Sequence, residues 1–363
     1  MADTVAGTPP YRTLGGIYHA GGTTFRVWAP EARRVDLVIE PPGDAIDPVA
    51  GPPPPPARRR SVRPLRRHDD GHWSGRFDDV RPGTLYRYRL DEDDGRIFPD
   101  PASRFQPYGV HGPSQVVDPS AFEWTDDDWR PPRLEECVFY ELHIGTFTPG
   151  GSFRAAIERL PHLVDLGVTA VELMPLADFP GERNWGYDGV ALYAPARCYG
   201  TPDDLRALVD RAHRLGLAVV LDVVYNHFGP DGAYANAFSP YYFTDRHRSP
   251  WGRGVNLDGP HSAPVRRFFL ENALHWLDEY HIDGLRLDAT HALEDGSATH
   301  FLAELSDTVR AHARRRVLLV AEDDRNLRQL VLSRGAGGFG LDAVWADDFH
   351  HQARVHAAGD REG

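Results

Sequence analysis

The fold is decided by the stretch GLRLDATH, residues 284–291, in which a short apolar run ends on a carboxylate. A second stretch, VAEDD at residues 320–324, ends in the same way, and VVLDVVYNH at residues 219–227 precedes both. In a barrel of parallel strands, side chains at the carboxyl ends of the strands converge on one mouth. Three such runs in order therefore predict a barrel with several carboxylates at its mouth.

Two of these carboxylates, Asp288 and Glu322, end neighbouring runs and form a pair of the kind that glycosidases use. A retaining glycosidase needs one ionised carboxylate to capture the anomeric carbon and one protonated carboxyl to donate to the leaving oxygen. Arg286 lies two residues before Asp288, so both side chains leave the same face of the strand, and we expect a charge-assisted contact that keeps Asp288 ionised. For retention the two carboxyl groups should be about 5 to 5.5 Å apart.

The chain from Cys137 onward alternates strand-like runs with helical patterns, which indicates parallel strands joined by helical crossovers and favours a (β/α)₈ TIM barrel. Six strands are predicted, at residues 138–142, 170–174, 218–223, 284–288, 317–321 and 341–344. Because eight strands close such a barrel and the sequence stops at Gly363, we expect an incomplete barrel and a fragment of a longer protein. Residues 226–263 show no helical or strand period and are predicted to be an irregular excursion.

Three helices are predicted between these strands. One carries an apolar stripe of Phe153, Ile157, Leu160 and Val164, and is closed by Gly167. The second begins with Thr201 as N-cap, Pro202 at the first helical position and an acid at the third. The third shows a stripe of Phe269, Ala273, Trp276 and Tyr280.

Residues 11–104 have an all-β pattern, with alternating aromatic and β-branched runs at 24–28, 35–39, 72–77 and 85–90. This spacing predicts a small immunoglobulin-like β-sandwich. The prolines at 52–56 and the arginines that follow are predicted to form a solvated loop between strands. We therefore expect two domains, a β-sandwich at 1–107 and a catalytic barrel at 108–363.

Composition narrows the class of ligand. The formal net charge is −13, and the one basic cluster is local (residues 58–67), so nucleic acid is not an expected partner and an uncharged ligand such as a sugar fits better. The two cysteines, Cys137 and Cys198, lack a metal-ligand spacing, which favours a cytoplasmic protein with buried thiols and without a metal or cofactor. No secretion signal or membrane span is expected.

Further motifs extend the pattern. They are YELHIGTF at 140–147, FPGERNWGYDG at 179–189, AEDDRN at 321–326 and WADDFHH at 345–351. Together with the three runs above, the chain resembles the α-amylase superfamily, glycoside hydrolase family thirteen, and within it the malto-oligosyltrehalose trehalohydrolases. The N-terminal sandwich resembles the domain that precedes the barrel in branching, debranching and trehalohydrolase enzymes, which implies a carbohydrate-binding-like domain at 1–107.

The resemblance implies an α-glycosidase that cleaves the α-1,4 bond next to the terminal trehalose of maltooligosyl trehalose and releases trehalose. It implies that Asp288 is the nucleophile and Glu322 the general acid/base. Residues implied in substrate binding are Asp222, His227, Arg286, Tyr187, His143, His291, Asp347 and Asp348. Structural roles remain alternatives for some of them: Asp222 as a partner of Arg286, His227 and His143 as core histidines, Tyr187 as a packing aromatic, and Asp347 and Asp348 in a solvated loop.

The sequence departs from the family pattern at two points. Many relatives carry a lysine three residues and a histidine four residues after the nucleophile, where this chain has His291 and Ala292. The Asn-His-Asp segment that supplies a third catalytic carboxylate does not occur in it. We therefore expect the chain by itself to be poorly soluble and almost inactive. A branching or isoamylase-like debranching enzyme, and an inactive glucan-binding fragment, remain alternatives.

Overall fold

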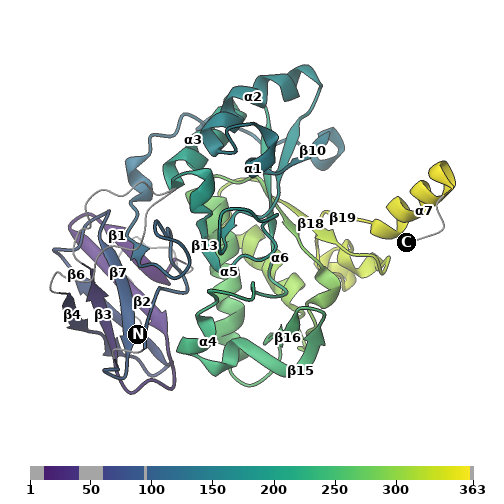
Figure 1. The fold of residues 1–363 in the computed structure, drawn as a ribbon. Coiled ribbons are helices and arrows are strands. Elements are labelled where there is room, and N and C mark those ends of the chain that lie inside the picture. Colours follow the sequence, from purple (N-terminus) through teal and green to yellow (C-terminus); the bar gives the residue numbers. More distant parts are fainter. Residues whose placement is uncertain (1–11, 41–59, 94–95, 360–363) are drawn as a thin grey trace.

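The computed structural model describes residues 12–40, 60–93 and 96–359. A β domain formed by the first part of the chain lies beside a larger α/β domain, and helix α7 (Asp347–Ala358) extends away from the rest of the molecule (Figure 1). The prolines at 52–56 lie outside the described residues.

The β domain contains two antiparallel sheets. One has the order β1 (Gly15–His19), β2 (Gly22–Trp28), β6 (His72–Phe77) and β5 (Arg66–Arg67). The other has the order β4 (Ser61–Pro64), β3 (Val35–Ile39), β7 (Leu85–Leu90) and β8 (Ile97–Phe98), and β9 (Ser114–Gln115) also pairs with β7. The four predicted strands are confirmed as β2, β3, β6 and β7.

The sheets pack face to face through alternating apolar side chains. Phe25 from one sheet meets Tyr86 from the other edge-on, with ring centroids 4.8 Å apart. The prediction of a loop for the arginines after the proline run was wrong for Arg63, Arg66 and Arg67, which lie in β4 and β5. These are edge strands, where exposed charged side chains are tolerated because only one neighbour must be paired.

The α/β domain is built on a six-stranded parallel sheet whose strand order follows the sequence. Its strands are β10 (Phe139–Leu142), β11 (Ala170–Leu173), β14 (Ala218–Val223), β17 (Gly284–Leu287), β18 (Leu318–Glu322) and β19 (Ala343–Trp345). All six predicted strands are confirmed, with ends that move by at most two residues. Within the described residues β10 and β19 each pair on one side only, as expected of an incomplete barrel.

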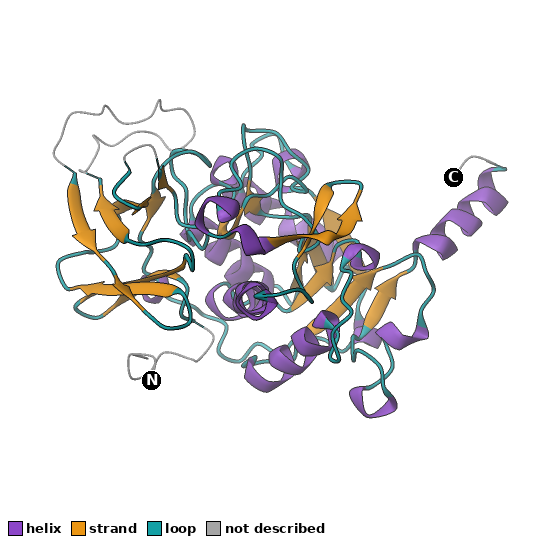
Figure 2. Cartoon of the chain, turned by 90° about the horizontal axis from the view of Figure 1, so that it is seen from below, coloured by secondary structure: helices purple, strands orange, loops and turns teal. Residues whose placement is uncertain are grey.

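Along the chain most helices come between these strands, and in space they pack against the sheet (Figure 2). They are α1 (Ile144–Phe147), α2 (Phe153–Asp165), α3 (Pro202–Arg214), α4 (Ala235–Phe238), α5 (Ser262–Glu279), α6 (Phe301–His312) and α7. Short 3-10 turns are η1 (Pro119–Ala121), η2 (Leu134–Glu136), η3 (Arg197–Tyr199), η4 (Pro240–Tyr242), η5 (Thr290–Ala292), η6 (Arg328–Leu330) and η7 (Arg334–Ala336). No helix in the described part of the chain is both long and apolar enough to span a membrane.

Two local predictions can be compared with the helices directly. The capping box of α3 is confirmed, since the Thr201 hydroxyl accepts from the Asp204 amide and the Asp204 carboxylate accepts from the Thr201 amide. The predicted stripe of α2 was wrong at Val164, which is 38% exposed, whereas Leu163 is fully buried. The buried face of α2 is formed by Phe153, Ala156, Leu160 and Leu163, so it is rotated from the predicted stripe and Val164 lies at its edge.

Two hairpins were not predicted. One joins β12 (Ala177–Asp178) to β13 (Ala191–Pro195) and presents the loop at residues 179–190. The other joins β15 (Phe243–Ser249) to β16 (Gly252–Val255), so the region predicted to be irregular contains ordered strands and the short helix α4.

The two domains meet along α5. Its Glu271 accepts hydrogen bonds from the backbone amides of Thr13 and Leu14 at 2.9 and 3.1 Å. Its Glu279, at the helix end, pairs with Arg104 at 3.4 Å. Both glutamates are buried, so water screens these contacts little. Aromatic contacts add to them, since Phe238 of α4 packs against Tyr88 of the β domain.

Candidate active site

Three neighbouring strands bring the predicted carboxylates together. Asp222 lies near the end of β14, Asp288 follows β17 directly, and Glu322 is the last residue of β18. Because β14, β17 and β18 are adjacent and parallel, these side chains leave the sheet at one end.

Arg286 joins the three carboxylates. Its Nη1 donates to Asp222 Oδ2 at 2.8 Å and to Asp288 Oδ1 at 2.9 Å, and its Nη2 lies 3.1 Å from Glu322 Oε1. The predicted contact between Arg286 and Asp288 is therefore confirmed. A guanidinium has five donors in one rigid plane, so a single buried side chain can hold several carboxylates in fixed directions.

Asp288 is held at both oxygens. Oδ1 accepts from Arg286, and Oδ2 accepts from Asn226 Nδ2 at 2.8 Å, which also donates to the Asp288 backbone carbonyl. Asn226 was not among the predicted site residues, although it belongs to the run that ends in His227. With both oxygens engaged, the carboxylate has a fixed orientation and only 8% of the residue is exposed.

Glu322 is held by Arg286 and by the backbone amide of Ala289, which donates to Oε2 at 2.7 Å. Ala289 adopts a left-handed conformation, φ 42°, that is unusual for a residue with a side chain. Burial raises the pKa of Glu322 above its ordinary value, Arg286 and the Ala289 amide oppose this rise, and Asp288 adds to it. A raised carboxyl pKa suits a group that must carry a proton at neutral pH.

Asp222 lies deeper than the other two carboxylates. Its Oδ2 accepts from the Tyr187 hydroxyl at 2.9 Å as well as from Arg286, while Oδ1 is buried without a hydrogen-bond partner among the described residues. Burial raises the pKa of Asp222 well above its ordinary value, and Arg286 acts against that shift.

The loop at residues 179–190, which carries Tyr187, is held through its backbone carbonyls. His143 Nε2 lies 2.8 Å from the Asn184 carbonyl, and His227 Nε2 lies 2.9 Å from the Tyr187 carbonyl. Arg197 donates to the carbonyls at the start of the loop, at 2.8 Å for Gly181. The structure thus places both predicted histidines as supports of this loop, and His227 directly follows Asn226, which contacts Asp288.

The remaining predicted residues lie at the rim. His291, in η5, is exposed, and its ring makes no hydrogen bond with any described residue. Asp347 and Asp348 form the first turn of α7, and Asp347 is near enough to Glu322 to raise its pKa. The structure therefore brings Asp347 toward the cluster and leaves His291 apart from it.

One buried acid beside this cluster was missed. Glu172 on β11 is 1% exposed, and its Oε1 accepts from the indole Nε1 of Trp345 at 3.2 Å. The sequence held a signal, since Glu172 is the only charged residue in the apolar run 170–174, and a charge buried in an apolar strand has a cost that needs a reason.

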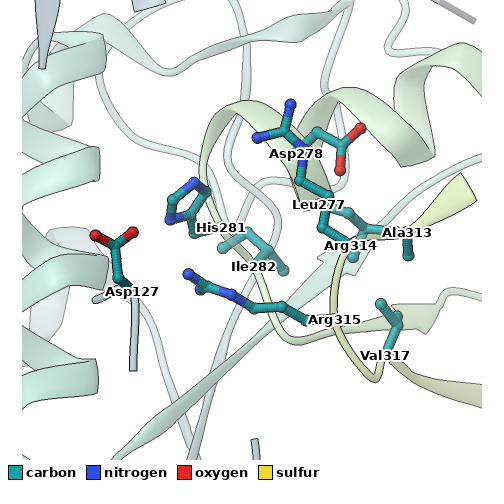
Figure 3. A pocket seen from close by; sticks show the side chains of 9 residues that line it. All are labelled: Asp127, Leu277, Asp278, His281, Ile282, Ala313, Arg314, Arg315 and Val317. Atoms are coloured by element: carbon teal, nitrogen blue, oxygen red, sulfur yellow. The ribbon is translucent and has the colours of Figure 1, made fainter. Parts of the chain in front are cut away.

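A cavity of about 190 Å³ lies at the other end of the sheet, beside His281, Arg315 and Val317 (Figure 3). Val317 precedes β18, whereas Glu322 ends it, so this cavity is distinct from the carboxylate cluster. Near it the buried His213 contacts Asp126 Oδ2 at 2.7 Å and Asp283 Oδ2 at 2.9 Å. Across the described residues no group of three or more potential ligands has the geometry of a metal site.

Two family models match the chain. One described as "Alpha amylase, catalytic domain" matches residues 101–247, and one described as "Carbohydrate-binding module 48 (Isoamylase N-terminal domain)" matches residues 13–109. The second match covers most of the β domain, and the first begins at its C-terminal end and continues through β14 of the α/β domain.

Curated relatives and a solved structure extend the match. The malto-oligosyltrehalose trehalohydrolase of Deinococcus radiodurans is 54% identical over 284 residues, which are 78% of this chain and 45% of the relative. That of Saccharolobus solfataricus is 44% identical over 351 residues, which are 97% of this chain and 58% of the relative. The crystal structure of a putative alpha amylase from Salmonella typhimurium is 41% identical with a TM-score of 0.85, covering 97% of this chain and 57% of that chain. This chain spans about half the length of the curated relatives it matches. By its motifs, its sheet and these matches, the chain belongs to the α-amylase family.

Proposed function

We propose that the chain carries the active site of a retaining α-glucan hydrolase that cleaves the α-1,4 bond next to the terminal trehalose of maltooligosyl trehalose and releases trehalose. The main observation behind the proposal is that Arg286 forms ion pairs with both Asp288 and Glu322, which lie at the ends of adjacent strands. The name shared by the Deinococcus and Saccharolobus relatives supports the choice of substrate.

In this proposal Asp288 attacks the anomeric carbon and Glu322 protonates the leaving oxygen. The fixed orientation of Asp288, with Asn226 and Arg286 on its two oxygens, supports the first role because a nucleophile must be aligned before reaction. The raised pKa of Glu322 supports the second. In the second half of the reaction Glu322 removes a proton from water, which attacks the glycosyl-enzyme and restores Asp288.

The other predicted residues divide by their contacts. Tyr187 and Asp222, which share a hydrogen bond, would contact the sugar at the cleavage position, and Asp347 would lie on the leaving-group side. We assign His143 and His227 to binding through the loop they support, and His291 and Asp348 to the rim. No cofactor takes part in this proposal.

The β domain, with a boundary near residue 107, would bind or position the α-glucan chain. The cytoplasm is the proposed location, since Cys137 and Cys198 are both free.

The test uses the protein translated from the complete gene, incubated with maltotriosyl trehalose and, separately, with maltopentaose. We expect free trehalose from the first and poor cleavage of the second, and loss of trehalose release in Asp288→Asn. Equal turnover of both substrates would contradict the specificity, and formation of α-1,6 branches would favour a branching enzyme. Binding of glucan without cleavage would favour the inactive alternative.

A further inference from the structure

Glu172 is a buried acid that the proposed reaction does not use. It lies in the middle of β11, in register with Glu141 on β10 and Val220 on β14. Its Oε1 bonds to Trp345, whereas its Oε2 is buried without a hydrogen-bond partner among the described residues. An acid that is buried with one oxygen unsatisfied is expensive, so a function at this place has to be considered.

The partner of Glu172 belongs to the strand that supports the proposed acid/base. Trp345 is the last residue of β19 and is paired in register with Glu322 on β18. The Trp345 carbonyl also accepts from the Asp323 amide at 3.2 Å. The hydrogen bond from Trp345 to Glu172 therefore connects β11 with the end of the sheet where Glu322 lies, on the far side of β14 and β17.

We propose that Glu172 is a positioning residue for the reaction: its carboxyl holds the indole of Trp345 and so fixes the ends of β18 and β19, which set the position of Glu322. The proposal rests on the proposed function for its catalytic consequence, but the Glu172–Trp345 coupling can be observed without catalysis.

The charge state of Glu172 adds a second consequence. Burial raises its pKa to about 7, Arg286 and the Trp345 indole oppose the rise, and Glu141 and Glu322 add to it. These are the charged groups that act on it from β10, β17 and β18. Hydrogen bonds to an ionised acceptor are roughly twice as strong as those to a neutral one, so the hold on Trp345 weakens as Glu172 takes up its proton.

The first test is spectroscopic and needs no turnover. Two-dimensional ¹H–¹⁵N spectra resolve the indole groups, and Trp345→Phe identifies the signal of Trp345. We expect this signal to shift as the pH passes through the neutral range, and the shift to disappear in Glu172→Gln, which keeps an acceptor but cannot ionise. A Trp345 signal that does not depend on pH, or that titrates unchanged in Glu172→Gln, would overturn the proposal.

The second test separates positioning from substrate binding. Glu172→Leu and Trp345→Phe should each lower kcat, roughly 100-fold if Glu322 moves by about 1 Å, with little change in KM. The double variant should lose no more than either single variant, because both remove the same contact. Glu172→Gln should keep most of kcat at its optimum but lose the change of rate near neutral pH.

Glu141→Gln is the matched control. Glu141 is exposed and lies beside Glu172 on β10, and its charge contributes to the raised pKa of Glu172. Glu141→Gln should therefore leave kcat at its optimum and the size of the indole shift unchanged, while the midpoint of that shift moves to a lower pH. These rates are measured on the protein translated from the complete gene. If that wild-type protein releases no trehalose while the indole coupling is present, the proposed function fails and the Glu172–Trp345 coupling stands. A normal kcat in Glu172→Leu would remove the positioning role.

Discussion

Replacement of Arg286 by methionine should destabilise the fold in a pH-dependent way. The side chain is buried, and it is the cation shared by Asp222, Asp288 and Glu322 at 2.8 to 3.1 Å. Removing one partner of a buried ion pair costs about 3–5 kcal/mol, because the other partner stays buried without compensation. Because all three contacts depend on the same guanidinium, we expect this cost once for Arg286→Met and not three times.

The sign of the pH dependence follows from the carboxylates. Burial already raises the pKa of Asp222 and of Glu322, and Arg286 opposes both rises, so its loss raises them further. An acid whose folded pKa lies above its unfolded pKa destabilises the fold increasingly as the pH rises between those two values. The loss in free energy of unfolding of Arg286→Met relative to wild type, its stability deficit, should therefore be larger at about pH 8 than at about pH 5.

Urea unfolding of both proteins at the two pH values measures this deficit. Arg206→Met is the control, since Arg206 is also buried but pairs with Asp203 far from the cluster. The control should be destabilised without the same growth of the deficit toward high pH. An equal deficit for Arg286→Met at both pH values, or one below about 1 kcal/mol, would show that Arg286 does not neutralise the carboxylates.

Three shorter predictions follow from the same structure. NMR early in the reaction should show the α configuration at the new reducing end of the malto-oligosaccharide product. A β configuration at that stage would contradict the assignment of Asp288 as nucleophile. Tyr187→Phe removes the hydrogen bond to Asp222 and should lower kcat/KM by roughly tenfold, as about 1.4 kcal/mol, while the unchanged ring keeps KM near wild type. Burial lowers the pKa of His213, but the hydrogen bonds to two aspartates outweigh this effect and raise it. The contribution of His213 to stability should therefore be fully present below about pH 6.5 and be lost as the pH rises through the raised pKa. His213→Asn should remove this pH dependence from the free energy of unfolding.

The sequence predicted contacts of the candidate site best where an apolar strand pattern contains a charged residue. Arg286 and Asp288 could be paired from the sequence because alternate residues of a strand share a face. The contact of Asn226 with Asp288 could not, because it depends on β14 lying beside β17, and 62 positions separate the two residues. Glu172 and Trp345 are 173 positions apart, so no local pattern connects them.

Other features of the structure have no recognisable pattern in the sequence. Strand β15, with the sequence FTDRHRS, is mostly polar on both faces, so the alternation that identifies a half-buried strand is missing. The histidines at 143 and 227 were predicted to bind substrate, but a sequence does not show whether a ring nitrogen faces a ligand or a backbone carbonyl. That choice is made by the loop at residues 179–190, whose path is set by tertiary contacts.

The contacts of α5 with the β domain restrict how this protein can change over evolution. Glu271 and Glu279 point their buried carboxylates at partners on the N-terminal side of the chain. A β-sandwich from another family member would fit as well only if it supplied equivalent donors, since otherwise the two buried acids would keep only their partners within α5, Arg267 and His275. Helix α5 precedes β17, which Asp288 follows directly, so a poorly matched sandwich would disturb the strand that positions the proposed nucleophile. Recombination between such enzymes should therefore succeed only when the sandwich and α5 are inherited together.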